Sequence, residues 1–243
     1  ACGLAGETGE AVVLSCTGAT ASRNYIPALT EAYYRKLPIL AITSTQHRGR
    51  VGQNVPQVID RSIQQKDIVR FSTLVPICHT KEDKWACNVH VNQAILELFR
   101  DGGGPVHIDL ETVYSRNLYV DTLPKVSPIF RINYKDTMPE LEKERIGILV
   151  GAHKKWTQAL TNAVDTFCER YNAVVLCDHT SNYYGKYRVL FSLLTGQDMY
   201  HPACDDFDLI IHIGDISGAY PFFRAREIWR VNPDGEIRDT SNA

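Results

Sequence analysis

The sequence predicts an α/β fold of two three-layer α/β/α domains with largely parallel sheets. Short runs of apolar and β-branched residues alternate with longer segments whose apolar residues recur at helical spacing. The alternation runs through residues 12–110, stops, and resumes at residue 146. Such alternation favours parallel strands covered by crossover helices. At 243 residues and 44% hydrophobic, the chain is long enough to build two cores.

The first domain is organised around residues 12–24, where a strand, a turn and a helix follow one another. Residues 12–14 predict a strand buried on both faces, and the small residues at 17–20 form a turn that opens a helix. The strand at 38–43 follows that helix directly, so the two strands should be parallel neighbours. Ligands of such sheets bind at the carboxyl ends of the strands.

The other elements of this domain follow from the same periodicities. The first residues resemble the last turns of a helix ended by Gly6 or Gly9, so we expect at least one strand and most of a helix upstream of Ala1. The remaining predicted elements are a helix at 22–36, a short helix beginning at 56–60, a strand at 70–77, a helix at 82–100 and a strand at 105–110.

The alternation of strand and helix patterns stops after residue 110, where prolines, charged residues and isolated aromatic residues follow. We therefore predict a first domain at 1–115, a linker at 116–145 and a central α/β domain at 146–243. The predicted elements of the central domain are strands at 146–150, 173–177, 209–213 and 227–231 and helices at 154–171 and 187–194.

Composition excludes several classes of partner. The net charge of -2 argues against nucleic acid, and no apolar run approaches the roughly 20 residues of a membrane span. No membrane partner is therefore expected. The seven cysteines are an odd number without a CxxC pair, which indicates a reducing, cytoplasmic setting rather than a disulfide framework.

One group of cysteines and histidines has metal-like spacing: Cys78, His79, Cys87 and His90. Cys87 and His90 would share a helix face. The favoured interpretation is structural, with Cys78 ending a strand and Cys87 on the buried face of the following helix. No metal ligand is assigned. His107 alternates with apolar neighbours in a strand, so it is interpreted as a wall residue rather than a catalytic base.

Two segments are suited to a ligand. At the turn, Gly18 and Ala19 let the backbone approach a flat ring, and Thr17 and Thr20 offer hydroxyl groups. The Gln57 side chain carries both a hydrogen-bond donor and an acceptor, which suits a polar ligand. The alternative interpretation of the turn is structural, with Thr17 and Asn24 only capping or bracing it. The polar loop after residue 43 is either a solvated loop or the rim of a substrate site formed by Arg48, Arg50 and Gln53.

Several motifs resemble a known family when taken in order. Residues 17–24, TGATASRN, match a T-S-G-(P/T)-(G/A)-x-x-N turn, with Asn24 kept and Thr20 at the variable fourth position, where it follows the menaquinone-type variant. A Q-x-x-D element follows at 57–60, GPVHIDL at 104–110, and WRVNPDG at 229–235. Together they resemble thiamine diphosphate enzymes of the 2-oxo-acid decarboxylase and acetolactate synthase superfamily, most of all its menaquinone-pathway members.

The resemblance implies a site and a reaction. The pyrimidine end of thiamine diphosphate would contact Thr17, Gly18, Ala19, Thr20, Asn24 and Gln57. The parent protein would decarboxylate a 2-oxo acid and transfer the acyl carbanion equivalent to an acceptor. Such enzymes are homodimers or tetramers, because the cofactor lies between domains of two subunits.

The family also has parts that this chain lacks. Its activating glutamate is expected upstream of Ala1, and Glu7, Glu10 and Glu31 do not match it, so no catalytic residue is assigned here. A GDG...NN element, which holds the diphosphate and Mg²⁺ in a C-terminal domain, is absent. We therefore expect a fragment that is inactive alone.

The resemblance does not identify the substrates of this protein, because the chain departs from the family at two motifs. Residues 44–48 read STQHR and residues 56–57 read PQ, where the menaquinone-pathway enzymes have A-D-R-P and N-Q. Two alternatives remain open. The chain is a non-catalytic subunit of a split thiamine diphosphate enzyme, or it is a nucleotide-binding oxidoreductase, against which stands the missing GxGxxG fingerprint.

Overall fold

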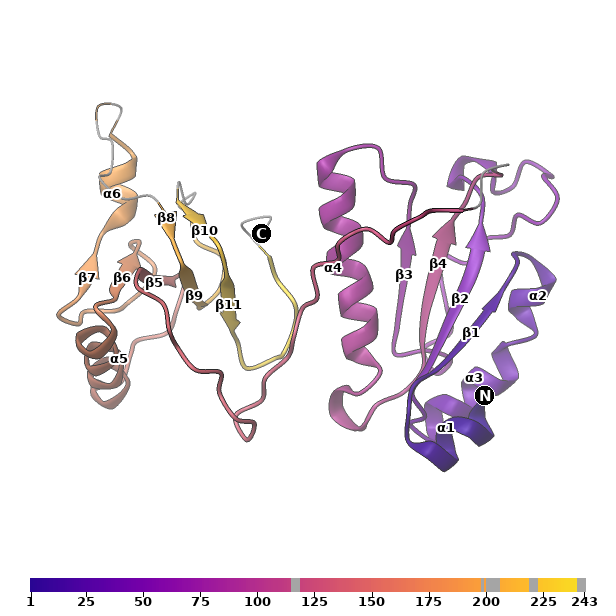
Figure 1. Ribbon diagram of the computed structural model, residues 1–243, viewed down its shortest axis with the longest axis horizontal. Coiled ribbons are helices and arrows are strands. Elements are labelled where there is room, and N and C mark those ends of the chain that lie inside the picture. Colours follow the sequence, from indigo (N-terminus) through magenta and orange to yellow (C-terminus); the bar gives the residue numbers. More distant parts are fainter. Residues whose placement is uncertain (115–118, 198, 200–205, 219–222, 240–243) are drawn as a thin grey trace. The chain divides into compact units, whose positions relative to one another are not determined.

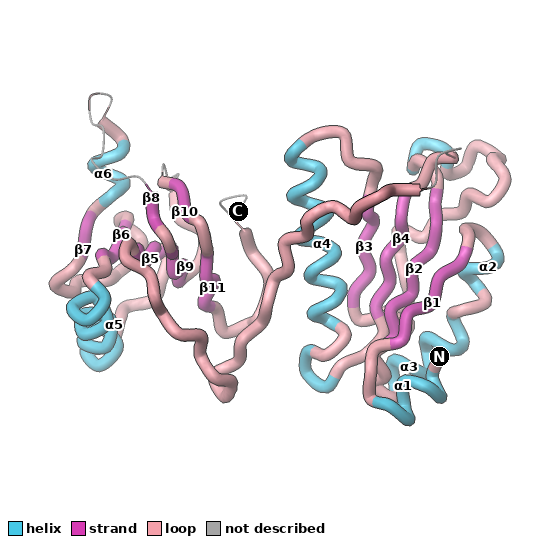
Figure 2. Tube along the Cα trace, viewed as in Figure 1, coloured by secondary structure: helices cyan, strands magenta, loops and turns pink. Residues whose placement is uncertain are grey.

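Parallel sheets form the centres of two units, Ala1–Arg131 and Ile132–Ala243 (Figure 1). The computed structural model describes residues 1–114, 119–197, 199, 206–218 and 223–239. All strand pairs in these sheets are parallel, and each unit also contains helices (Figure 2). The predicted α/β class with largely parallel sheets is confirmed.

The first unit is built on a four-stranded sheet with the order β1-β2-β4-β3. Its strands are β1 (Val12–Cys16), β2 (Ile39–Thr45), β3 (Phe71–Val75) and β4 (Val106–Glu111). Its helices are α1 (Cys2–Thr8), α2 (Thr20–Arg23), α3 (Ile26–Tyr34) and α4 (Lys81–Glu97), with 3-10 turns η1 (Arg48–Arg50) and η2 (Arg100–Gly102).

Successive residues of β2 point to opposite faces and so build a core on each side of the sheet. Ile39 is fully buried in a cluster that includes Ala5 of α1 and Ala32 of α3. Leu40 instead packs in a second cluster with Ala94 of α4. Helices α1 and α3 therefore cover one face and α4 the other, which gives the three layers expected from the sequence.

The prediction that the first strand is buried on both faces is wrong. Among the described strands, β1 pairs with β2 alone and forms the edge of its sheet, so the Val13 side chain is 58% exposed. The predicted parallel pairing with the strand after the helix is confirmed, with Val12 opposite Ile39.

Two predicted helices differ from the structure. The helix expected at 22–36 is divided into α2 and α3, because Pro27 has no N–H to donate to the carbonyl of Arg23 four residues earlier. The short helix expected at 56–60 is absent, and a turn takes its place. Gln57 has a φ of 66°, which a right-handed helix does not accommodate.

Helix α1 ends as the sequence predicts. Gly9 has a φ of 71° and donates its backbone N–H to the carbonyl of Ala5, forming a left-handed cap. The described residues 112–114 and 119–145 contain no helix or strand, while the beginning of the predicted linker, residues 116–118, lies outside the described residues.

The second unit has a five-stranded sheet with the order β11-β9-β5-β6-β7. Helix α5 packs on one face through Cys168, and α6 packs on the other through Phe191. A helix was predicted over 187–194, but its first part is the two-residue strand β7. The elements are β5 (Ile146–Val150), α5 (Gln158–Tyr171), β6 (Val174–Cys177), β7 (Arg188–Val189), α6 (Phe191–Thr195), β8 (Asp206–Phe207), β9 (Leu209–Ile213), β10 (Arg224–Ala225) and β11 (Ile228–Val231).

Within the described part of the chain, no helix is both long enough and apolar enough to span a bilayer.

Burial predicts opposite outcomes for the same substitution at two valines of the first sheet. Val106 is fully buried, so Val106→Ala should lower the free energy of unfolding by about 2–3 kcal/mol through lost apolar contact and a cavity. Val13→Ala on the exposed edge should change it by less than about 0.5 kcal/mol. Urea unfolding followed by circular dichroism compares them, and equal losses would contradict the edge position of β1.

Candidate functional site

The turn after β1 packs closely against the loop that follows β2. Gly18 is buried, and a Cβ atom placed on it would lie 2.5 Å from the backbone oxygen of Gln57 and 3.0 Å from that of Ser44. Only glycine fits this approach. Two residues that the sequence predicted for one site, Gly18 and Gln57, are therefore brought together, with the Gln57 backbone at the contact and its side chain exposed.

Ala19 holds a backbone conformation that favours glycine. Its φ is 56° and its ψ is -132°, a region where the Cβ of an L-residue is strained. The Ser22 hydroxyl donates to the carbonyl of Ala19 over 2.6 Å and holds the turn in place. In the motif T-S-G-(P/T)-(G/A)-x-x-N, Ala19 occupies the position of the glycine. The positive φ of Ala19 is therefore the backbone conformation that this position of the motif requires.

Three polar side chains of the turn face outward from the fold. Thr17, Thr20 and Asn24 are exposed, and within the described chain their side chains make no hydrogen bond. Their hydroxyl and amide groups therefore do not brace the turn through hydrogen bonds to the described residues. The bracing comes from the buried Ser22 instead.

A buried ion pair fixes this turn to the sheet. The Arg61 side chain is 2% exposed, and its Nη2 donates to Oδ1 of Asp109 on β4 over 2.8 Å. The same guanidinium donates to the hydroxyl of Ser22 over 3.3 Å and to the carbonyl of Ser44 over 2.8 Å. Arg61 thus connects α2, the end of β2 and the end of β4.

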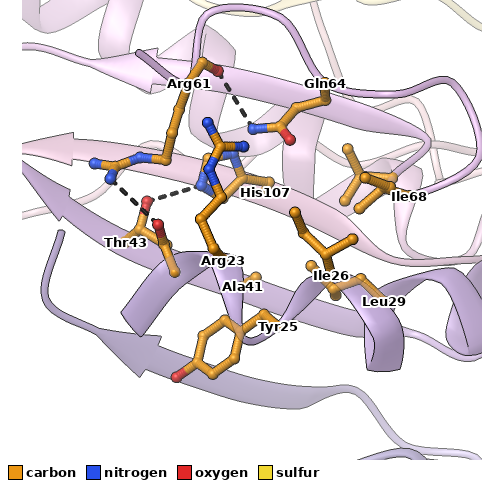
Figure 3. Close-up of a pocket in the computed structure, with 12 residues that line it drawn as sticks. Arg23, Tyr25, Ile26, Leu29, Ala41, Thr43, Arg61, Gln64, Ile68 and His107 are labelled. Carbon is orange, nitrogen blue, oxygen red and sulfur yellow. Dashed lines mark hydrogen bonds between the residues drawn. The ribbon is translucent and has the colours of Figure 1, made fainter. Parts of the chain in front are cut away.

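A hydrogen-bonded chain continues from Asp109 across the sheet. Thr43 donates its hydroxyl to Oδ1 of Asp109 over 2.9 Å, so its oxygen must accept from Nε2 of His107, 2.8 Å away. Nδ1 of His107 then accepts from the hydroxyl of Ser72 over 2.9 Å. The contacts assign the Nε2–H tautomer, and Figure 3 shows Thr43 and His107 joined on this face.

His107 is a buried wall residue, as the sequence predicts. Burial lowers the pKa of His107 to about 4, opposed by the carboxylate of Asp109 and supported by the charge of Arg61. The imidazole is therefore neutral near pH 7. A cavity of about 20 Å³ lies beside it, lined also by Tyr25 and Leu29, and is large enough for a single water molecule.

A larger, polar cavity of about 270 Å³ lies between the loop after β2 and strand β3. The Ser62 hydroxyl and backbone N–H donate to Asp60, and with Arg48 and Arg23 nearby they lower the pKa of that carboxyl. The cavity wall therefore carries charges of both signs. Its polar lining includes Thr45, Arg48, Asp60, Ser62, Ser72 and His90.

Of the three residues predicted for substrate binding, Arg48 alone is among those that line the 270 Å³ cavity. Arg48 lines the 270 Å³ cavity, whereas the residues that line it do not include Arg50 or Gln53. Arg50 donates to Oε1 of Gln46 over 2.7 Å, and both Arg50 and Gln53 are exposed.

Sequence reasoning missed Arg61, Asp109, Thr43 and Ser22. One signal was present: Asp109 stands in a strand of buried residues, and a charge there requires a partner. The sequence does not show which of its many basic residues that partner is.

The structure brings together the two cysteines of the cysteine and histidine group. Within the described residues, no group of three or more His, Cys, Asp or Glu side chains is placed to hold a metal ion. Cys78 follows β3, and Cys87 is buried on α4 with its Sγ 3.3 Å from the Sγ of Cys78.

Two turns of the second unit contact each other at the carboxyl ends of strands β5 and β9. Strands β5 and β9 are neighbours, and Asp215 after β9 donates its N–H to the carbonyl of Ala152 after β5 over 2.8 Å. A Cβ on Gly151 would lie 2.0 Å from the Asp215 oxygen. A pyrophosphate needs open space at such strand ends, so this contact disfavours nucleotide binding there.

Comparisons with known proteins point to one group. The chain is 33% identical over 154 residues (59% of its length) to the 2-succinyl-5-enolpyruvyl-6-hydroxy-3-cyclohexene-1-carboxylate synthase of Phocaeicola vulgatus. It is 34% identical over 163 residues (62%) to the synthase of that name from Bacteroides thetaiotaomicron, and 36% identical over 134 residues (54%) to that of Bacteroides fragilis. The chain covers 27%, 29% and 24% of these relatives.

These relatives confirm the resemblance drawn from the motifs, both to the thiamine diphosphate superfamily and to its menaquinone-pathway members. No family model matches the sequence.

The strained turn predicts that Ala19→Gly stabilises the fold. Glycine removes the Cβ strain at φ 56°, and after its larger loss of chain entropy we expect a gain of about 1 kcal/mol in the free energy of unfolding. Ala21→Gly, two residues on within α2, is the matched control and should lose about 0.5–1 kcal/mol. Denaturant titrations measure both, and a loss at position 19 would refute the strain.

Neutral His107 predicts a pH dependence of stability. Its pKa is about 4 when folded, below the ordinary 6.5, so the unfolded chain binds more protons between these values. Stability from this group is present above pH 6.5 and is lost as the pH falls toward 4, by roughly 3 kcal/mol. Unfolding measured from pH 7.5 to 4 should show a shallower slope in His107→Gln, and an unchanged slope would contradict burial as the cause.

Proposed function

We propose that the first unit is the pyrimidine-binding part of a thiamine diphosphate enzyme. The parent protein would decarboxylate a 2-oxo acid and transfer the acyl carbanion equivalent to an acceptor. The observation that carries the proposal is the turn at residues 17–24, a glycine-dependent turn with free polar side chains at the carboxyl end of a parallel strand. The synthases that match 54–62% of the chain support it.

The residues of the turn fit one face of a flat aminopyrimidine. Gly18 lets the turn pack closely on the adjoining backbone, and Ala19 lies half-buried beside it. Thr17, Thr20 and Asn24 hold unengaged hydroxyl and amide groups on the exposed side of the turn. The exposed Gln57 side chain lies on the adjoining loop and offers both a donor and an acceptor. Thiamine diphosphate, when bound, supplies the electron sink for the carbanion.

The chain's own contribution would be to position the ring. The turn is held by Ser22 and Arg61, so the backbone that carries its polar side chains is already ordered before a ligand arrives. Such preorganisation reduces the entropy lost on binding. The diphosphate and Mg²⁺ would be held by another domain.

Arg48 is the residue that we assign to the carboxylate of the 2-oxo acid. It lines the 270 Å³ cavity together with Thr45 and Ser72, whose hydroxyls suit the oxygens of a small polar substrate. Arg50 and Gln53 would serve at the rim. The acceptor and the 2-oxo acid are not specified by these contacts, because the loop departs from the A-D-R-P and N-Q elements of the menaquinone-pathway enzymes.

The proposal includes a homodimer or tetramer of the parent protein and a cytoplasmic setting. One wall of the cofactor site would come from this turn, and the opposite wall from a diphosphate-binding domain. The described cysteines are free thiols, which supports a reducing environment.

The proposal predicts that this polypeptide alone releases no CO2 from a panel of 2-oxo acids supplied with thiamine diphosphate and Mg²⁺. In the parent protein, Thr20→Val should raise the KM for thiamine diphosphate about tenfold by removing one hydrogen bond. Thr166→Val, at an exposed position of α5, is the matched control and should leave it unchanged.

The coding sequence on both sides of this chain decides between the parent enzyme and a split subunit. The enzyme requires a glutamate shortly before Ala1 and a GDG element after Ala243. A reading frame that stops near Ala243, with the element on a separate chain, would favour the split subunit. The absence of both elements, or turnover by this polypeptide alone, would overturn the proposal.

A further inference from the structure

Two thiols meet where β3 passes into α4. Cys78 lies in the connection after β3, and Cys87 lies in the second turn of α4. Their Sγ atoms are 3.3 Å apart, and each is 3.8 Å from the carbonyl oxygen of Pro76. Figure 1 shows β3 followed by α4 with this connection between them. The two Sγ atoms are closer to each other than non-bonded apolar atoms usually are. A small further movement of the two side chains would bring the sulfurs to the length of an S–S bond.

The two cysteines have no other evident task. Both are free thiols, and no third ligand joins them to make a metal site within the described residues. They lie outside the turn at 17–24, and neither lines the 270 Å³ cavity. Their contact therefore needs an explanation separate from the proposed cofactor site.

We propose that Cys78 and Cys87 form a reversible disulfide when the chain meets a small-molecule disulfide such as oxidised glutathione. This thiol–disulfide site is independent of the proposed function.

The environments of the two sulfurs set the order of the steps. Cys87 is buried, and burial, with a further contribution from the Cys78 thiol, raises its pKa to about 12. Cys87 is therefore protonated at neutral pH and a poor first nucleophile. Cys78 is only partly buried, so its thiolate meets the incoming reagent first.

The exchange balances in two displacements. The Cys78 thiolate attacks one sulfur of the glutathione disulfide, whose S–S bond breaks to release one glutathione thiolate. Cys87 then loses its proton to that base and attacks Sγ of Cys78, releasing the second glutathione. One protein S–S bond forms, two protein S–H bonds are lost, and the two electrons reduce the reagent to two thiols.

The new bond would fasten a segment that borders the cavity. The cross-linked loop contains the capping box of α4, in which Thr80 accepts from the N–H of Asp83 and the Asp83 carboxylate accepts from the N–H of Thr80. Leu74 before it and His90 after it both line the 270 Å³ cavity. Oxidation would therefore slow the opening of this wall, and reduction would release it.

Peptide mapping of the intact chain tests the proposal. Trypsin cuts after Arg70, Lys81, Lys84 and Arg100, so Cys78 and Cys87 fall in separate peptides, 71–81 and 85–100, with one cysteine each. Folded chain treated with oxidised glutathione and then alkylated should yield these peptides joined, at their summed mass less two hydrogen atoms. Dithiothreitol should separate them.

Variants distinguish this pair from unspecific oxidation. In Cys87→Ser, peptide 71–81 should accumulate a glutathione adduct, because the second displacement is blocked. Cys2→Ser, which alters a thiol that donates to the carbonyl of Ala28, should leave the 71–81 to 85–100 link unchanged. Amide hydrogen exchange at 76–87 should slow on oxidation in the unaltered chain and remain unchanged in Cys87→Ser.

Two results would overturn the proposal. One is glutathione adducts on both cysteines without the joined peptide. The other is a set of links in which Cys78 pairs with other cysteines as often as with Cys87. Either result would show that the 3.3 Å contact does not direct the exchange.

Discussion

The ion pair between Arg61 and Asp109 is the constraint that holds together the carboxyl ends of the strands in the first unit and the loops that follow them. Asp109 lies on β4, and Arg61 lies in a long connection that has no helix of its own after η1. Removing one partner of such a buried pair typically costs about 3–5 kcal/mol, because the other charge is left without compensation. The connection is therefore held to the sheet at one strongly bonded point, from which the turn and the cavity take their positions.

The strained backbone of Ala19 is connected to the Arg61–Asp109 ion pair by hydrogen bonds. The unfavourable backbone of Ala19 is held by Ser22, Ser22 accepts from Arg61, and Arg61 is held by Asp109. On the other side of the carboxylate, Thr43 and His107 extend the network to Ser72 on the edge strand β3. The candidate turn, with its exposed polar groups, is thus supported by buried side chains that each have a hydrogen-bond partner, which is the arrangement that keeps a site ordered.

The fold followed from the sequence where burial was complete. Strands β5 and β9 have the predicted bounds because each is an unbroken apolar run flanked by turn residues. The two-residue strands β7, β8 and β10 are too short for any periodicity to register. The position of strand β1 in the sequence was predicted correctly, but its burial was not. Composition alone does not separate an edge strand from a central one.

The candidate site was predictable only in its local part. Gly18 and Ala19 were found because small residues after a strand signal a close backbone approach. Arg61 was not, since an arginine among polar residues resembles a solvated loop and its partner is 48 positions away in the numbering. Gln57 was chosen for its side chain, whereas its backbone oxygen makes the contact with Gly18. Contacts between distant segments depend on chain geometry that local patterns do not encode.

The edge position of β1 has a consequence for the protein's hydration. Along a parallel strand, successive backbone amides point alternately to the two sides, and among the strands that the structure describes β1 pairs with β2 alone. Half of its N–H and C=O groups are therefore bonded within the sheet, while the other half must be satisfied by solvent or by an added extended chain. The strand that leads into the candidate turn thus carries two kinds of backbone amide, one exchanging only when the sheet opens and one in continuous contact with its surroundings.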